Sequence, residues 1–308
     1  VFLEEYSPFV FGAQTVGGTS ALHHLGALLK DRPNKKISIP NPSWANHRQI
    51  FEYLGYQVEN YPYFDMKNSC LLFQEMKHHI EQLEEGSIVL LHASCHNPSG
   101  LDLTDIQWQE LAKIIREKRL FPLFDCAYQG FGEGLKADVK SINIFCEMLK
   151  ELAVAYSCSK NFGMYGERVG ACFVFSKFQD QLLKAASLIK KSLRATFSNP
   201  PCHGAYLCAK VLTSEILKKS WESELHSYLE RIHRLRAKLK KALERHHKHP
   251  LYIQEAHGLF MFTGIRPEKV KNLREETGIY LASDGRLNVT GLNEKNFDHV
   301  ALTLTQYL

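Results

Sequence analysis

Short apolar runs recur along the part of the chain that precedes Pro200. Several of them are apolar throughout, as strands of a parallel sheet covered on both faces tend to be. The residues between these runs have a different, helical periodicity. The apolar runs predict strands at Lys36–Ile39, Ile88–Ala93, Phe121–Cys126, Leu152–Tyr156 and Gly170–Phe175.

Amphipathic segments separate the predicted strands. Thr104 and Asp105 follow a Pro-Ser-Gly turn and are candidate caps for one of these helices. Strands that alternate with helices favour an α/β fold, whose sheet is built by right-handed crossovers. The periodicity predicts helices at Thr19–Lys30, Asn46–Leu54, Leu71–Glu84, Thr104–Lys118 and Ile142–Lys150.

The pattern changes after Pro200. From Leu225 to Leu243 an apolar residue recurs every three or four positions, which predicts one long amphipathic helix. We therefore expect a large domain over residues 1–225 and a smaller α+β domain over residues 226–308, entered by this helix. Weak strand signals follow the helix at Leu251–Gln254, Leu259–Thr263 and Ile279–Leu281.

Composition narrows the class of protein. The 308 residues are 44% hydrophobic and 23% charged, which excludes a disordered chain, a collagen-like chain and a short disulfide scaffold. The net charge is +5, but residues 230–249 alone carry eight Lys or Arg and two Glu, a net of +6. These basic residues fall largely between the apolar positions of the long helix, so we interpret them as its solvated face. We do not expect a nucleic-acid partner.

Cysteine usage and hydropathy indicate a cytoplasmic protein. The eight cysteines include no C-x-x-C pair, so neither a thioredoxin-type pair nor a zinc ribbon is suggested. Reduced thiols are typical of intracellular proteins. No run approaches the roughly 18 apolar residues of a membrane span, and the first ten residues lack the features of a signal peptide. We expect no membrane association.

Gly17, Gly18 and Thr19 open a predicted helix. Backbone N–H groups at a helix N-terminus suit a phosphate group, and glycines let a ligand approach the backbone closely. The segment is neither a Walker A loop nor a dinucleotide-binding G-x-G-x-x-G motif. A plain turn before a helix is the alternative interpretation.

Polar residues follow three predicted strands. Asn97 follows the first, Asp125 ends the second with Tyr128 close behind, and Lys160 follows the third, with Arg168 eight residues later. Taken singly, these residues also fit a β-turn, a helix cap or a surface lysine. Together they would converge, because open α/β sheets bind ligands beyond the carboxyl ends of their strands. A lysine at that edge can become a nucleophile or a base.

Seven blocks in the sequence support a family resemblance that covers nearly the whole chain. In them the chain resembles class I aminotransferases of the aspartate/aromatic type, which are pyridoxal-phosphate enzymes of fold type I. The resemblance implies a mostly parallel, seven-stranded sheet sandwiched by helices, with a smaller C-terminal α+β domain. The blocks are N-P-S-W-A-N-H at 41–47, H-N-P-S-G at 96–100, F-D-C-A-Y-Q-G-F at 124–131, S-C-S-K-N-F-G at 157–163, E-R-V-G-A-C at 167–172, S-N-P-P at 198–201 and G-R-L-N-V-T-G at 285–291.

The resemblance also implies roles for individual residues. Lys160 would bind pyridoxal 5'-phosphate covalently and serve as general base and acid, Asp125 would pair with the ring nitrogen, and Tyr128 would complete the catalytic set. His47 and His92 would support the pocket. The positions that match cofactor-binding residues are Gly18, Thr19, Trp44, Asn97, Asp125, Tyr128, Ser157, Ser159, Lys160 and Arg168.

Substrate binding would use two arginines, together with Trp44 and Asn97. Arg286 would grip the substrate α-carboxylate with its planar fork. Arg194, with Ser198 nearby, matches a position that reaches the side-chain carboxylate across a dimer interface. The resemblance thus implies a homodimeric, ping-pong transaminase acting on aspartate or glutamate and 2-oxo acids such as 2-oxoglutarate.

Other functions stay open at this stage. An aromatic amino acid aminotransferase is one alternative. Another is an inactive relative or fragment, because only sixteen residues precede Gly17 where the family has a longer segment. Residues 157–160 also match S-x-x-K of penicillin-binding proteins, but K-T-G is absent. Residues 92–96 and 246–249 offer zinc-ligand types without a second cluster, so no metal is expected.

Overall fold

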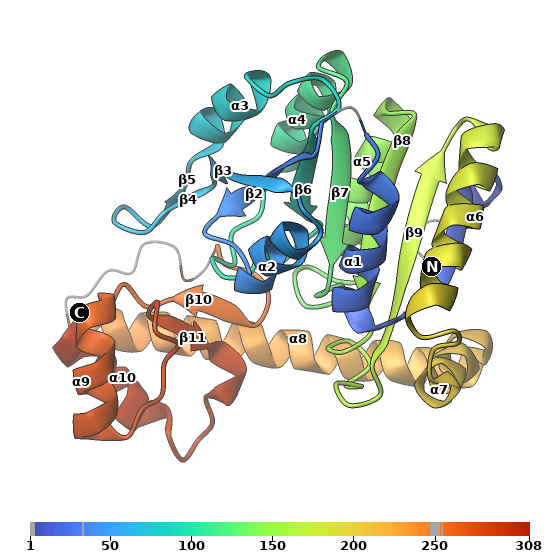
Figure 1. The fold of residues 1–308 in the computed structure, drawn as a ribbon. Coiled ribbons are helices and arrows are strands. Elements are labelled where there is room, and N and C mark those ends of the chain that lie inside the picture. Colours follow the sequence, from blue (N-terminus) through green and yellow to red (C-terminus); the bar gives the residue numbers. More distant parts are fainter. Residues whose placement is uncertain (1–3, 33, 247–252, 254) are drawn as a thin grey trace.

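A seven-stranded sheet forms the centre of the computed structural model, which describes residues 4–32, 34–246, 253 and 255–308 (Figure 1). The strand order is β1-β9-β8-β7-β6-β2-β3. Within the described residues, only β9 opposes its neighbours, so the sheet is mostly parallel, as predicted. The strands are β1 (Val10–Val16), β2 (Lys36–Asn41), β3 (Gln57–Pro62), β6 (Ile88–His92), β7 (Phe121–Cys126), β8 (Glu151–Ser157) and β9 (Val169–Ser176).

The five strands predicted before Pro200 are confirmed, and two further strands extend the sheet at its edges. Every residue of β6 and β7 is buried, in agreement with their continuous apolar sequences. The pattern did not predict β1 and β3. Their residues are mostly half-buried and mix polar with apolar side chains, so neither forms an apolar run.

Two apolar cores lie on opposite faces of the sheet. Along β6, Val89 and Leu91 belong to one core, whereas Ile88 and Leu90 belong to the other, as the alternation of side chains along a strand requires. The first core is covered by α3 (Phe73–Glu81), α4 (Asp105–Glu117) and α5 (Lys140–Met148), and the second by α1 (Gly17–Leu29), α2 (Ala45–Tyr53) and α6 (Gln179–Thr196).

Helix α4 begins where the sequence predicted. The Thr104 side chain accepts a hydrogen bond from the Gln107 backbone, and the Gln107 side chain accepts one from the Thr104 backbone. This capping box satisfies two N–H groups at the start of the helix. The five helices predicted before Pro200 are all present, with ends that differ by a few residues.

Helix α8 (Glu215–Glu244) runs below the sheet and leads to the C-terminal elements (Figure 1). It begins ten residues before the predicted apolar stripe. The strand predicted at Leu259–Thr263 is present as β10. Further elements are α7 (Cys202–Thr213), β10 (Phe260–Phe262), α9 (Pro267–Thr277), β11 (Arg286–Asn288), α10 (Phe297–Tyr307), the hairpin β4 (Phe64–Asp65) and β5 (Cys70–Leu71), and the 3-10 turns Glu4–Phe9, Ala137–Val139 and Val289–Gly291.

One strand prediction is wrong, and another falls mostly outside the described residues. Residues 279–281 have no strand pairing, and the partner of β10 is instead β11. The apolar side chains of Ile279 and Leu281 pack against the first of the two cores instead of belonging to a strand. Of the segment Leu251–Gln254, only Ile253 falls inside the described residues. One apolar cluster includes residues on both sides of position 225, so the division into two domains stays a prediction.

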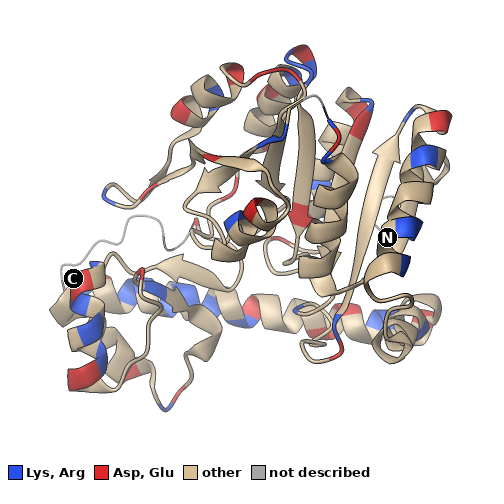
Figure 2. Ribbon diagram, viewed as in Figure 1, with Lys and Arg blue, Asp and Glu red and all other residues tan. Residues whose placement is uncertain are grey.

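The interpretation of the basic segment also needs a correction. Arg234 and Lys241 are exposed as expected, and Figure 2 shows Lys and Arg along α8. Arg236, however, is only 2% exposed, and its Nη2 donates to the carbonyls of Gly258 at 2.8 Å and Phe260 at 3.0 Å. Arg231 donates to the Leu292 carbonyl. Two arginines thus connect α8 to the backbone of the C-terminal segment, because their long side chains reach its carbonyls.

No helix in the described part of the chain is both long enough and apolar enough to span a membrane.

Candidate active site

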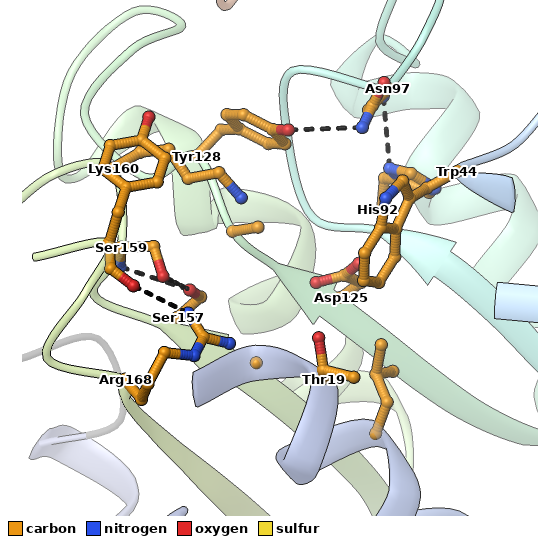
Figure 3. A pocket seen from close by; sticks show the side chains of 14 residues that line it. Thr19, Trp44, His92, Asn97, Asp125, Tyr128, Ser157, Ser159, Lys160 and Arg168 are labelled. Carbon is orange, nitrogen blue, oxygen red and sulfur yellow. Dashed lines mark hydrogen bonds between the residues drawn. The ribbon is translucent and has the colours of Figure 1, made fainter. Parts of the chain in front are cut away.

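A cavity of about 190 Å³ lies at the carboxyl ends of β6, β7 and β8, beside the N-terminus of α1 (Figure 3). This edge of an α/β sheet is where ligands bind in open folds of this kind. Every residue predicted to bind the cofactor lines the cavity, and His92 does too. The lining residues are Gly18, Thr19, Leu22, Trp44, His92, Asn97, Asp125, Ala127, Tyr128, Ser157, Ser159, Lys160, Tyr165 and Arg168.

The N-terminus of α1 forms one end of the cavity. Within the described part of the chain no side chain caps this helix, so its first N–H groups lie at the cavity end without a capping acceptor. Gly17 has a φ of +75°, and a Cβ there would lie 2.6 Å from Arg168 Nη2. A Cβ on Gly18 would lie 3.0 Å from the Cβ of Ser157. The two glycines therefore let an arginine and a serine approach the helix end closely.

This end of the cavity carries donors of the kinds that can bind a phosphate group. Ser157 Oγ donates to Ser159 Oγ at 3.1 Å and accepts from the Ser159 backbone at 3.2 Å. Arg168 has a φ of +53°, which is uncommon for a residue with a side chain, and its Nη1 donates to the Tyr165 carbonyl. Hydroxyls, a guanidinium and helix N–H groups together form an anion-binding cradle.

Asp125, at the end of β7, is a buried carboxylate. It is 8% exposed, and His47 Nε2 lies 2.8 Å from its Oδ2. Burial acts to raise the pKa of Asp125, but the His47 hydrogen bond and the nearby His92 and Lys160 outweigh it, so the pKa falls below its ordinary value. Asp125 is therefore ionised at neutral pH and His47 donates to it. Ser43 Oγ lies 2.8 Å from His47 Nδ1 and orients the ring.

Two histidines beyond Asp125 are held neutral. Burial, followed by the neighbouring His47, lowers the pKa of His92 to about 3, although Asp125 acts in the opposite direction. Its Nδ1 accepts from the Asn97 backbone at 3.3 Å, so the proton resides on Nε2. Among the described residues His92 Nε2 has no hydrogen-bond partner, although it is buried in the cavity wall. The pKa of His96 is also lowered by burial.

Lys160 lies across the cavity from Asp125 (Figure 3). Its Nζ is 4.5 Å from the centre of the Tyr128 ring. Burial lowers the pKa of Lys160, with Arg168 acting in the same direction and Asp125 in the other. A lysine with a lowered pKa loses its proton more readily, and the neutral amine is a nucleophile and a base.

A hydrogen-bonded chain connects Tyr128 to the C-terminal part of the molecule. Asn97 Nδ2 donates to Tyr128 Oη at 3.2 Å, and Arg286 Nη1 donates to Asn97 Oδ1 at 2.7 Å. The Arg286 guanidinium also lies over the Phe260 ring, 4.8 Å from its centre. Burial raises the pKa of Tyr128, with Asp125 adding to the effect, so Tyr128 keeps its proton at neutral pH.

The structure does not bring every predicted residue to the cavity. Arg194, in the last turn of α6, and Ser198 beyond it are both exposed and lie outside the cavity lining. Two other residues belong to the site although the sequence argument missed them: Ser43, which contacts His47, and Tyr165, which lines the cavity and is 57% exposed. The sequence signal that could have identified Tyr165 was its position between Lys160 and Arg168, which were both predicted to bind the cofactor.

Comparison with known proteins identifies the class of protein to which this chain belongs. Residues 11–304 match the family "Aminotransferase class I and II". Aspartate aminotransferase of Escherichia coli (strain K12) is 42% identical over 287 residues, which are 92% of this chain and 72% of that protein. Aromatic-amino-acid aminotransferase of Pseudomonas aeruginosa is 38% identical over 296 residues, 95% of this chain and 74% of that protein.

This chain also resembles the solved structure of a relative. Aromatic-amino-acid aminotransferase from Burkholderia pseudomallei, covalently bound to pyridoxal phosphate, superposes with a TM-score of 0.93 at 39% identity, covering 97% of this chain and 76% of that one. The chain belongs to the class I and II aminotransferases, a pyridoxal-phosphate-dependent family, and within it to the aspartate transaminase type.

Proposed function

We propose that the protein transfers an amino group between aspartate or glutamate and a 2-oxo acid, with pyridoxal phosphate held in the cavity at the ends of β6, β7 and β8. The observation that carries the proposal is the placement of three groups in one cavity: the Lys160 amine, the ionised Asp125, and the anion cradle at the start of α1. Family membership supports the same reaction.

The residues present fit this cofactor. A Cβ at Gly17 would displace the Arg168 guanidinium of the cradle, and the donors of the cradle match a phosphate monoester. We assign phosphate binding to Gly18, Thr19, Ser157, Ser159 and Arg168. When bound, pyridoxal phosphate supplies an electron sink for negative charge that develops at the substrate Cα.

We assign the rest of the cavity to the ring and to covalent attachment. An ionised Asp125, held by His47, suits a protonated ring nitrogen. Trp44 would stack on the ring, and His92 would support the pocket from the wall. Lys160 is the residue that would hold the cofactor covalently.

The chain's own residues then account for proton movement and orientation. Lys160, with its lowered pKa, accepts the proton from the substrate Cα and returns a proton later in the cycle. Asn97 and Tyr128 place N–H and O–H donors in the cavity wall, where Asn97 Nδ2 donates to Tyr128 Oη, and Tyr128 remains protonated because burial raises its pKa. These donors favour negative charge on an oxygen atom placed between them.

Two arginines support a dicarboxylic substrate. We assign Arg286, which reaches the cavity through Asn97, to the α-carboxylate. We assign Arg194, with Ser198, to the side-chain carboxylate of a substrate bound in the partner subunit of a homodimer, because its exposed position is too far from its own cavity to line it. Charge-assisted pairs of this kind favour dicarboxylates over neutral side chains.

Aromatic amino acids are the second candidate substrates. The observation that favours them is that relatives named aspartate aminotransferase and relatives named aromatic-amino-acid aminotransferase match this chain at similar identity, 42% and 38%. We further propose a cytoplasmic homodimer, with a large domain over residues 1–225 and a small domain over residues 226–308.

An assay of two donors tests the proposal. The protein is loaded with pyridoxal phosphate, and transamination of 2-oxoglutarate is measured with aspartate and with phenylalanine. We expect a higher kcat/KM for aspartate. A higher value for phenylalanine would favour the second candidate, and turnover of neither donor by protein that retains the cofactor would contradict the proposal.

A further inference from the structure

A second cavity, of about 380 Å³, lies on the other side of the segment that carries Lys160. It shares no lining residue with the first cavity. Ser157, Ser159 and Lys160 line the first cavity, whereas Cys158 lines the second, so the two cavities are separated by a single backbone segment. The walls of the second cavity are mostly apolar and include Tyr156, Phe162, Phe173, Leu212 and Trp221.

Two cysteines meet in the wall of this cavity. Cys158 follows β8 and Cys208 lies on α7, and both belong to one small buried cluster that also contains Val169. Both side chains line the second cavity, and Cys208 Sγ lies 3.7 Å from Met164 Sδ. Residues 50 positions apart in the sequence therefore bring two free thiols into one cluster.

The two thiols are unequal. Interaction between the two cysteines lowers the pKa of Cys208 and raises the pKa of Cys158, where burial adds to the increase. In such a pair the thiol with the lower pKa is the nucleophile, and its partner keeps the proton. A reactive thiol next to a second thiol is the arrangement found in redox-sensitive cysteines.

Small molecules can reach the pair through the cavity. Both cysteines are more than nine-tenths buried, but Phe162, Leu212 and Trp221 in the cavity wall are half-buried and border the solvent. A volume of about 380 Å³ admits a small hydroperoxide, whereas a protein thiol could not enter.

We propose that Cys208 is a site of oxidation by small hydroperoxides, with Cys158 as the thiol that resolves the product to a disulfide. In the first step the Cys208 sulfur attacks a peroxide oxygen and the O–O bond breaks. Cys208 becomes a sulfenic acid, and the leaving oxygen takes a proton and departs as water or an alcohol. In the second step the Cys158 sulfur attacks Cys208, the S–O bond breaks, and water leaves. The two thiols lose two electrons and the peroxide gains them.

The disulfide would act on the first cavity. Cys158 lies between Ser157 and Ser159, whose hydroxyls are in contact in the anion cradle, and a bond to α7 would pull that segment away from the start of α1. This consequence rests on the proposed function. We expect the oxidised protein to bind pyridoxal phosphate about tenfold more weakly than the reduced protein, a change equivalent to about 1.4 kcal/mol.

Peptide mapping of the wild-type protein tests the oxidation site directly. The cofactor-free protein is treated with equimolar hydrogen peroxide, alkylated, and digested with trypsin without reduction. We expect residues 151–160, which contain Cys158, to be linked to residues 195–210, which contain Cys208. The second peptide also contains the exposed Cys202, so Cys202→Ser is the matched control and should retain the link. Cys158→Ala should lose it and accumulate oxidised Cys208.

Each contrary result has its own meaning. Absence of the linked peptide from the wild-type protein, or its loss in Cys202→Ser, would overturn the oxidation site. A disulfide that leaves the affinity for pyridoxal phosphate unchanged, before and after reduction with dithiothreitol, would overturn the coupling to the cradle. Failure of the reduced protein to bind pyridoxal phosphate at all would contradict the proposed function, which the peptide map does not test.

Discussion

Asp125 shows how single residues define this site. A carboxylate that is buried without partners becomes neutral, but His47, oriented by Ser43, holds this one ionised. The sequence predicted Asp125 and Lys160 because each follows an apolar strand at the edge where ligands bind. It did not predict Ser43, because a serine one turn before a histidine on a helix is common and carries no signal by itself.

The lowered pKa of His92 predicts a pH dependence of stability. The unfolded chain binds a proton to this ring near pH 6.5, whereas the folded protein does so only near pH 3. Between these values the unfolded state holds more protons, so the free energy of unfolding decreases as the pH falls, with a slope of up to about 1.4 kcal/mol per pH unit. Urea unfolding at several pH values should show a flatter acid limb for His92→Gln, and no change for the exposed His226→Gln. An unchanged slope in His92→Gln would contradict the neutral assignment.

Arg194 is the residue-scale test of substrate preference. Replacing it by leucine removes a charge-assisted pair with the substrate side-chain carboxylate, so kcat/KM for aspartate should fall by about 100-fold, equivalent to about 2.7 kcal/mol. The value for phenylalanine should change by less than about threefold. Steady-state kinetics of Arg194→Leu beside Lys191→Leu, an exposed control on the same helix, provide the measurement. Equal losses for both donors would remove Arg194 from the distal site.

At the scale of elements, the site depends on where β1 ends and α1 begins. The sequence predicted α1 and its glycines, but not β1, because half-buried strands at a sheet edge mix polar and apolar side chains. β11 was also missed, because it is only three residues long. It brings Arg286 to the cavity, and only the family motif had indicated a role for that residue.

Gly17→Ala tests the role of the junction between β1 and α1 in binding the cofactor phosphate, with Gly55→Ala as a matched control. Both glycines have positive φ, +75° and +79°, but a Cβ at Gly17 would clash with Arg168 and a Cβ at Gly55 would meet open space. Backbone strain should destabilise both variants by about 1 kcal/mol. Titration with pyridoxal phosphate should show about tenfold weaker binding for Gly17→Ala alone. Equal affinities would mean that the cradle does not bind the phosphate.

At the scale of the whole molecule, one helix connects the central sheet to the C-terminal elements. The apolar stripe from Leu225 to Leu243 predicted α8. The basic residues of the same segment were interpreted as its solvated face, but Arg236 pairs with backbone carbonyls instead of water. A one-dimensional pattern gives the periodicity of a helix, but it does not reveal which charged side chain meets a buried turn.

Arg236→Met is expected to destabilise the whole chain. It leaves the carbonyls of Gly258 and Phe260 without their donor, at a cost of about 3 kcal/mol in the free energy of unfolding. Chemical denaturation compared with Arg234→Met, an exposed position on the same helix, measures this cost. A loss no greater than that of the control would mean that these hydrogen bonds do not stabilise the junction.

Covalent attachment of pyridoxal phosphate to Lys160 is the central claim, and borohydride trapping with peptide mapping tests it most directly. After loading, reduction and tryptic digestion, the account predicts a cofactor-bearing peptide spanning residues 151–168, because trypsin does not cleave after a modified Lys160 and the next site is Arg168. Lys177→Ala, a control just beyond the end of β9, should give the same peptide, and Lys160→Ala should give none. Label at another lysine in the wild-type protein, or undiminished label in Lys160→Ala, would contradict the account.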